Sequence, residues 1–271
     1  MNNQREKTFS LKFLGLVLLA GLVQASTFLV YSQTGPPSKS FQQWTKKEAQ
    51  QILDDSPWAT KQEVRLRYAD TARRIAGGTV PSATEGALIN TPSNQAEMGG
   101  AEAPVDFQFT LRLRSALTVR RALVRLKQLE ANYDQMNEKD RAAFDNKYKG
   151  LLECPACEQN YVLTLSALSK QRPGADPIFT VFKGGRLADL QRYVFIANNR
   201  GERRDLIHFV PPKVPGDEAV FYFSRFNDKG EPLLSSTDTE LIANFTNNEV
   251  NMNTNFKVNV AKVIVNGQVD F

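Results

Sequence analysis

Short apolar runs separated by turn-forming residues fill the last third of the chain and restrict what it can fold into. The runs lie at residues 178–182, 194–197, 206–210, 219–226, 241–245 and 256–265, with a helical pattern at 186–193. Turn residues such as Asp228-Lys229-Gly230 and Asn266-Gly267 stand between them. Apolar runs at this spacing are typical of antiparallel strands joined by tight turns. The sequence therefore predicts an antiparallel β-sheet or sandwich in the C-terminal half.

Two further strands are predicted upstream of that region. Residues 105–114 alternate apolar and polar side chains, which is the clearest strand signal in the chain. Residues 63–68 alternate in the same way and predict a neighbouring strand. Between the two, residues 76–104 are rich in Gly, Ala, Ser, Thr, Asn and Pro and carry almost no large apolar side chain. Such a composition predicts a disordered loop.

Two central segments show the helical period instead, so the predicted fold class is α+β. Residues 117–136 and 138–151 place apolar side chains at helical spacing, which predicts two amphipathic helices. The first carries four basic residues, Arg120, Arg121, Arg125 and Lys127. Acidic residues follow closely, so we interpret this face as a solvated helix surface. The net charge of +5 is likewise spread over the chain, and nucleic acid is not an expected partner.

A shorter helix is predicted near the start of the folded body, at residues 46–54. Thr45 and Glu48 have the spacing of a capping box, and the helix should end before Pro57. The only two tryptophans of the chain, Trp44 and Trp58, bracket this helix. We interpret Trp44, Pro57 and Trp58 as structural anchors that pin the helix to the body by burial.

The first 31 residues form a separate unit in this interpretation. A basic stub with Arg5, Lys7 and Lys12 leads into an apolar run from Phe13 to Tyr31, which predicts a signal peptide or a transmembrane anchor helix at residues 1–31. Residues 32–40 then resemble a flexible spacer. Residues 41–271 are expected to form a single extracytoplasmic domain that is periplasmic, membrane-anchored or secreted.

The cysteines offer the most specific chemical motif. Cys154 and Cys157 are the only two, and they have the spacing of redox dithiols, metal sites and haem attachment. Haem attachment requires His where Glu158 stands, and a structural zinc site requires about four ligands. A thioredoxin-like motif would follow a strand, whereas a helix is predicted before Cys154. Outside the cytoplasm, we therefore expect a local disulfide bond.

No other motif predicts an active site. His208 lies in an alternating strand, where it should share a face with Leu206 and Val210, and we interpret it as structural. Gly184-Gly185 before a helical pattern is a weak anion-site signal, since a turn before a helix favours glycine in any case. We expect no catalytic residue, no cofactor and no metal site.

Two segments carry a resemblance to a known group of proteins. Residues 41–59, with Trp44 and the motif Ser-Pro-Trp-Ala at 56–59, and the terminal hairpin at 256–271 resemble uncharacterised exported proteins common in acidobacteria. That group combines a secretory leader, a tryptophan-bracketed helix and an antiparallel C-terminal region. The resemblance implies an exported α+β protein and supplies no activity. The apolar run contains no lipobox cysteine, so the mode of membrane attachment stays open.

Together these features favour a non-enzymatic binding or structural protein, exported or membrane-anchored, acting as an accessory subunit of a cell-envelope or membrane complex. Its expected partners are envelope proteins, and the membrane itself if the N-terminal segment is uncleaved. The alternative is an exported redox or metal-binding protein that uses Cys154 and Cys157. A third hypothesis, a carbohydrate or lipid binder, rests on sandwich-like strand spacing and on Tyr222 and Phe226.

Overall fold

A computed structural model describes residues 36–66, 105–246, 252 and 254–271. The predicted leader at 1–31, residues 32–35 of the predicted spacer and the predicted loop at 76–104 lie outside the described residues. Within the described part of the chain, no helix is both long enough and apolar enough to cross a membrane.

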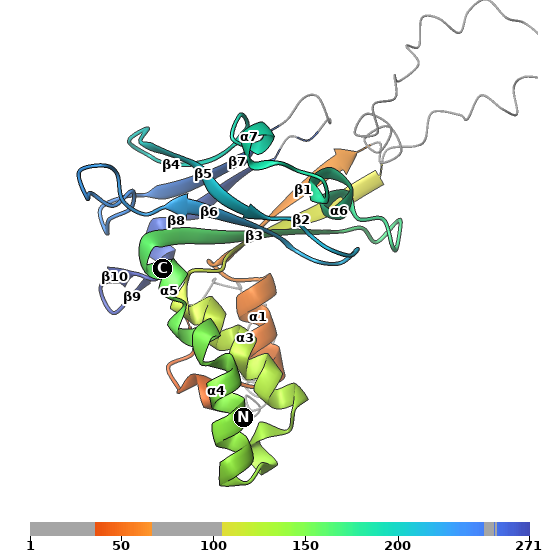
Figure 1. Ribbon diagram of the computed structural model, residues 1–271, viewed down its shortest axis with the longest axis vertical. Helices are drawn as coiled ribbons and strands as arrows, with labels where there is room; N and C mark the ends of the chain where they lie inside the picture. The colour runs from red at the N-terminus through yellow and green to blue at the C-terminus, as the bar shows by residue number, and fades with distance from the viewer. Residues whose placement is uncertain (1–35, 67–104, 247–251, 253) are drawn as a thin grey trace, which may run out of the picture. The chain divides into compact units, whose positions relative to one another are not determined.

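An eight-stranded antiparallel sheet forms the larger part of the fold (Figure 1). Its strands in chain order are β1 (Ala59–Leu66), β2 (Val105–Leu113), β3 (Asn160–Leu168), β4 (Val194–Asn198), β5 (Arg203–Val210), β6 (Ala219–Ser224), β7 (Glu240–Phe245) and β8 (Asn255–Asn259). They lie side by side in the order β1-β2-β3-β6-β5-β4-β7-β8. The sheet is nearly closed, since the Asn255 amide of β8 donates a hydrogen bond to Gln62 Oε1 of β1 at 3.0 Å. The predicted antiparallel sheet is confirmed.

Aromatic side chains from alternate strand positions fill the inner face of this sheet. The fully buried rings of the strands include Phe107, Phe109, Phe221, Phe223, Phe245 and Phe256. Phe221 packs edge-on against Phe245, with ring centroids 4.9 Å apart, and the Phe245 ring lies 6.1 Å from that of Phe256. Along β6 and β7, buried residues alternate with partly exposed ones, so the rings of these strands lie on one face, because successive side chains of a strand point to opposite faces.

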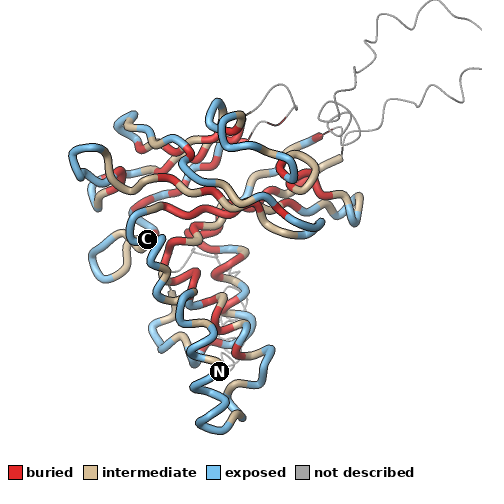
Figure 2. The backbone as a smooth tube through the Cα atoms, in the orientation of Figure 1, coloured by how far each residue is buried: buried red, intermediate tan, exposed pale blue. Residues whose placement is uncertain are grey.

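The helices are α1 (Lys46–Asp54), α3 (Leu117–Glu130), α4 (Glu138–Glu153), α5 (Pro155–Gln159), α6 (Pro177–Phe182) and α7 (Leu187–Leu190), with 3₁₀ turns η1 (Phe41–Gln43), η3 (Tyr133–Gln135) and η4 (Val260–Val263). We call η1, α1, α3, η3 and α4 the helical lobe. Its helices lie together on one side of the sheet, and α1 packs against α3 (Figure 1). Figure 2 shows buried residues in the sheet and along α1 and α3, whereas α4 contains none.

The first helix begins as the sequence predicts. Thr45 Oγ1 accepts a hydrogen bond from the Glu48 amide at 3.2 Å, and the Thr45 amide donates to Glu48 Oε2 at 2.7 Å, which completes the capping box. Trp44 and Trp58, on either side of α1, are 3% and 1% exposed. Pro57 is also buried. Both ends of α1 are therefore held against the body of the protein.

Three predicted elements differ from the structure. The apolar run at 178–182 is helix α6, because the Asp176 side chain accepts a hydrogen bond from the Phe179 amide at 3.0 Å and Pro177 occupies the first helical position. The helix predicted over 117–136 ends earlier, at Glu130. Two residues later, Asn132 adopts a left-handed conformation with φ of 53°, which does not continue the helix. The strand predicted over 256–265 divides into β8, η4 and β9.

The C-terminal hairpin pairs β9 (Ile264–Val265) with β10 (Gln268–Val269). Asn266 and Gly267 both have positive φ, 52° and 79°, which is the geometry of the tight turn that Asn-Gly favours. Directly after β10, the Asp270 carboxylate accepts hydrogen bonds from the Leu117 and Thr118 amides at 3.0 and 3.2 Å. The end of the chain thus caps α3, whose own N-cap residue, Ala116, offers no side-chain acceptor.

Candidate functional site

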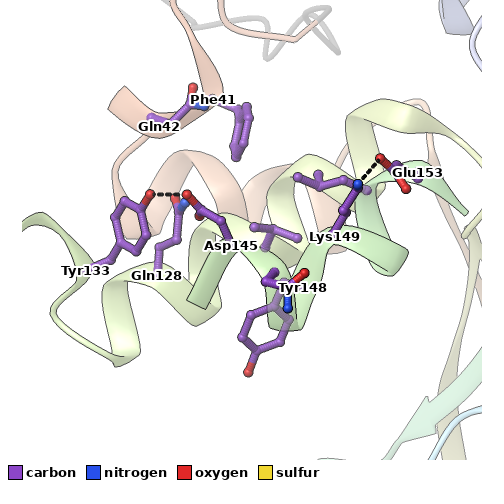
Figure 3. A pocket seen from close by; sticks show the side chains of 11 residues that line it. Phe41, Gln42, Gln128, Tyr133, Asp145, Tyr148, Lys149 and Glu153 are labelled. Atoms are coloured by element: carbon purple, nitrogen blue, oxygen red, sulfur yellow. Dashed lines mark hydrogen bonds and ion pairs between the residues drawn. The ribbon is translucent and has the colours of Figure 1, made fainter. Parts of the chain in front are cut away.

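A groove of about 560 Å³ lies in the helical lobe, between η1, α3 and α4 (Figure 3). Its lining combines apolar and aromatic side chains with polar and charged ones: Phe41, Gln42, Val124, Gln128, Tyr133, Asp145, Asn146, Tyr148, Lys149, Leu152 and Glu153. Six of these residues belong to α4. The groove is therefore shaped by a helix that buries none of its own residues.

A buried guanidinium holds one wall of the groove in place. Arg125 of α3 is 5% exposed, and its Nε donates to the Trp44 carbonyl oxygen at 2.8 Å. Its Nη1 and Nη2 donate to the Asp134 carboxylate at 3.2 and 3.0 Å. A bidentate charged pair of this kind fixes geometry as well as adding stability. Arg125 thus ties both η1 and η3 to α3, and with them Phe41 and Tyr133.

Tyr133 and Asp145 form a hydrogen-bonded pair across the groove. The Tyr133 hydroxyl donates to Asp145 Oδ2 at 2.8 Å (Figure 3). Burial raises the pKa of the Tyr133 hydroxyl, and the hydrogen bond to Asp145 and the charge of that carboxylate raise it further. Tyr133 therefore remains a protonated donor at neutral pH and has no character of a general base.

Three aromatic rings form a row beside the groove. The Phe144 ring centroid lies 5.2 Å from that of Tyr133 and 4.5 Å from that of Tyr148. These contacts hold α4 to η3, and each ring remains partly exposed. The remaining charged pair of the lining, Lys149 and Glu153, is 3.6 Å apart and largely exposed, so it contributes little stability.

The groove has the chemistry of a binding surface. Val124, Leu152 and the aromatic rings supply apolar area, and Gln128, Asn146 and the ion pair supply a polar margin. Protein interfaces share this anatomy, with aromatic residues enriched at the centre and polar residues around it. The apolar positions Phe144, Tyr148 and Leu151 follow helical spacing in the sequence, which predicts helix α4 but not a groove between α4 and η1.

The cysteine pair forms the predicted disulfide bond between Cys154 and Cys157. Cys154 ends α4 in a left-handed conformation and precedes α5, so the segment between the two cysteines is the start of a short helix. Cys157 is buried, and Cys154 is partly exposed. Among the described residues, no group of three or more His, Cys, Asp or Glu side chains is placed to hold a metal ion.

The structure corrects the placement of His208. A register shift between Leu206 and His208 interrupts the pairing of β5 with β6, so that Leu206 is buried while His208 is exposed. His208 therefore does not share a face with Leu206 as predicted. Its ring lies 5.0 Å from that of Tyr222, which is partly buried.

The two glycines before α7 differ in their surroundings. An added Cβ at Gly184 would meet no atom within 4 Å, whereas one at Gly185 would lie 3.3 Å from the Phe182 carbonyl oxygen, so Gly185 allows close packing there. Helix α7 has only four residues. The weak anion-site signal in this segment thus has a structural explanation, as the sequence interpretation allowed.

A second, smaller hollow of about 270 Å³ lies beside the sheet. Residues 59–61 of β1, Lys257 and Asn259 of β8 and the nearby Lys262 contribute to its lining. The hollow is therefore placed where the first and last strands of the sheet approach each other.

No protein-family model matches this chain, and no curated protein and no solved structure shows a significant match to it. The functional interpretation therefore depends on the geometry of the chain itself.

Proposed function

We propose that this chain is a non-enzymatic binding protein of the cell envelope, exported or anchored at a membrane, and that the helical groove receives an apolar segment of a partner protein. The observation that carries the proposal is the groove at α4, an apolar and aromatic hollow built on a helix without a buried residue. A helix whose apolar side chains are only partly covered has surface left for a partner.

The shape of the groove favours a helical partner segment. An amphipathic helix that enters a groove between two helices buries side chains at positions three and four residues apart. The aromatic rings of the lining and Leu152 would contact that apolar stripe, and Gln128, Asn146 and Lys149 would contact its polar margins. This arrangement fits an accessory subunit that holds another envelope protein.

The experiment places a photo-reactive side chain at Tyr148 in the full chain, expressed in its own host. The matched control places it at Ala143, which is exposed on the same helix and does not line the groove. We expect a specific cross-linked protein from position 148, much less from position 143, and loss of the product in the Leu152→Asp variant. Equal yields at both positions, or no effect of Leu152→Asp on a folded protein, would contradict the proposal.

A redox function is the second candidate, favoured by the partly exposed Cys154 beside the buried Cys157. An incoming thiolate reaches the more exposed sulfur of such a pair first. The variant Cys154→Ala/Cys157→Ala separates the two proposals. If the protein is a binding module, cross-linking from the groove should persist in this double variant. If the protein has a redox function, cells with the double variant should show the same phenotype as cells that lack the protein.

Export is tested by the mass of the intact protein purified from its native membranes. The basic and apolar N-terminal segment and the resemblance to exported acidobacterial proteins support this part of the proposal. Val23-Gln24-Ala25 offers small residues for signal-peptidase cleavage before Ser26, so a mature chain that starts at Ser26 indicates cleavage, and a full-length chain in the membrane indicates an anchor. A full-length chain found in the cytoplasmic fraction would contradict both.

A further inference from the structure

The two end strands of the nearly closed sheet leave a gap, which we call the seam. At one end of the seam, Asn255 of β8 donates a hydrogen bond to the side chain of Gln62 in β1. Beyond that contact, residues 59–61 of β1 and residues 257 and 259 of β8 line the hollow of about 270 Å³. At that end, β1 and β8 are joined through the side chain of Gln62. In a closed barrel, main-chain hydrogen bonds would join the two strands instead.

Main-chain groups of both strands point into the seam. In β1, the Trp58 carbonyl oxygen accepts a hydrogen bond from the Leu113 amide of β2 at 2.9 Å. Because the direction of main-chain groups alternates along an antiparallel strand, Lys61 directs its amide and carbonyl away from β2. In β8, the Thr254 carbonyl oxygen accepts from the Phe245 amide at 2.8 Å, so Lys257 directs its main-chain groups away from β7.

These outward groups have no strand partner in the described part of the chain. The sheet pairs β1 with β2 and β8 with β7, and β1 and β8 are its two ends. An unpaired strand edge is a template for the main chain of another segment. The seam offers two such edges at once, one on each side of the hollow.

Three of the four charged side chains around the hollow are basic. Lys61, Lys257 and Lys262 contribute ammonium groups, and Asp55 is the acidic residue of the lining. Lys257 also has a carboxylate neighbour outside the lining, Glu240, at 3.5 Å, but both side chains of that pair are exposed. Exposed pairs of this kind are weak and are readily exchanged for another carboxylate. The hollow therefore favours an acidic occupant.

We infer that the seam binds a short extended segment of a partner protein, with acidic side chains, as an added β-strand. Main-chain hydrogen bonds to Lys61 and Lys257 supply affinity, and the lysine side chains select for Glu or Asp in the segment. A segment of about three residues spans the lined part of β1 at roughly 3.3 Å per residue. This surface is separate from the helical groove, and the inference does not depend on the groove being occupied.

The test uses the full chain and a fluorescently labelled peptide of alternating Thr and Glu, with binding followed by fluorescence anisotropy. We expect a dissociation constant below about 1 mM and, in the variants Lys61→Glu and Lys257→Glu, binding roughly tenfold weaker. Lys213→Glu is the matched control, because Lys213 is exposed and lies outside the lining. That variant should bind as the unmodified protein does.

A second peptide separates strand addition from simple charge attraction. Methylation of alternate amide nitrogens removes main-chain donors while all carboxylates remain, and it should abolish binding. Equal affinity of the methylated peptide would overturn the inference and indicate an anion site. Equal affinity of a Thr-Lys peptide, an equal loss in Lys213→Glu, or no binding up to about 1 mM would also overturn it. None of these outcomes bears on cross-linking at Tyr148, which tests the proposed function.

Discussion

The sheet and helix α4 differ sharply in how they are held. The sheet encloses a continuous core in which Phe107, Phe109, Phe221, Phe223 and Phe245 are all 0% exposed. Helix α4 has sixteen residues and none of them is buried. Regions with few buried apolar contacts open at a lower free-energy cost than the core does. We therefore expect the sheet to be more stable than α4, and the groove proposed to bind a partner lies on α4.

The largest expected effect comes from truncating one aromatic ring in each region. Phe221 packs against the rings of Phe182, Phe209 and Phe245 at centroid distances of 4.9 to 5.3 Å. Phe221→Ala should lower the free energy of unfolding by about 3–5 kcal/mol, since it leaves a cavity in a packed core. Phe144→Ala in α4 should cost about 1 kcal/mol, because that ring is already partly exposed.

Urea unfolding followed by circular dichroism measures both variants in the same way. Similar losses of stability in the two variants would mean that α4 belongs to the same cooperative unit as the sheet. A large loss for Phe221→Ala with a small one for Phe144→Ala would show that α4 is held more weakly than the sheet.

A smaller effect is expected at the link between the two regions. Asp270, at the end of the chain, accepts hydrogen bonds from the first two amides of α3, which belongs to the helical lobe. Asp270→Ala removes that cap and should lower the free energy of unfolding by about 1 kcal/mol. Asp270→Asn is the control, because it keeps a hydrogen-bond acceptor and loses only the charge.

Thermal unfolding of the two variants distinguishes a cap from an incidental contact. We expect Asp270→Asn to retain most of the stability that Asp270→Ala loses. If both variants unfold at the temperature of the unmodified protein, the C-terminal hairpin does not stabilise α3, and the two regions are coupled through other contacts.

Local signals in the sequence were enough to predict most of the strands and α1. Thr45 and Glu48 specify the start of α1, and the alternation over 105–114 specifies β2, because each pattern depends on neighbours within a few residues. The bond between Cys154 and Cys157 was also predicted, although that prediction depended on the expected export as well as on the spacing. In contrast, the apolar run at 178–182 fits either a buried strand or a short helix, and only the cap at Asp176 decides between them.

The candidate sites could not be predicted in the same way, because they join residues that are distant in the chain. Phe41 and Tyr148 line the same groove, and Lys61 and Lys257 line the same hollow at the seam. Neither pairing follows from local spacing, since it requires the packing of α4 or the closure of the sheet. The bulge before His208 could not be predicted from local spacing either, because it depends on how β5 pairs with β6.

The smallest expected effect concerns the pH response of α1, and it tests whether the helical lobe loosens without the sheet. Hydrogen bonds from Lys39 and from the Thr45 amide and hydroxyl lower the pKa of Glu48 from 4.5 to about 2. A carboxyl group whose pKa is lower in the folded state stabilises the fold fully above its unfolded pKa and loses this contribution as the pH falls toward the folded value. Between about pH 4.5 and 2, the start of α1 should therefore become less protected from amide hydrogen exchange.

In Glu48→Gln this pH dependence should disappear, because the side chain no longer titrates. Amides of β3, in the middle of the sheet order, serve as the internal reference, and their protection should not change over the same range. Parallel losses in α1 and β3 would mean that acid opens the whole domain at once, and α1 would then unfold together with the sheet.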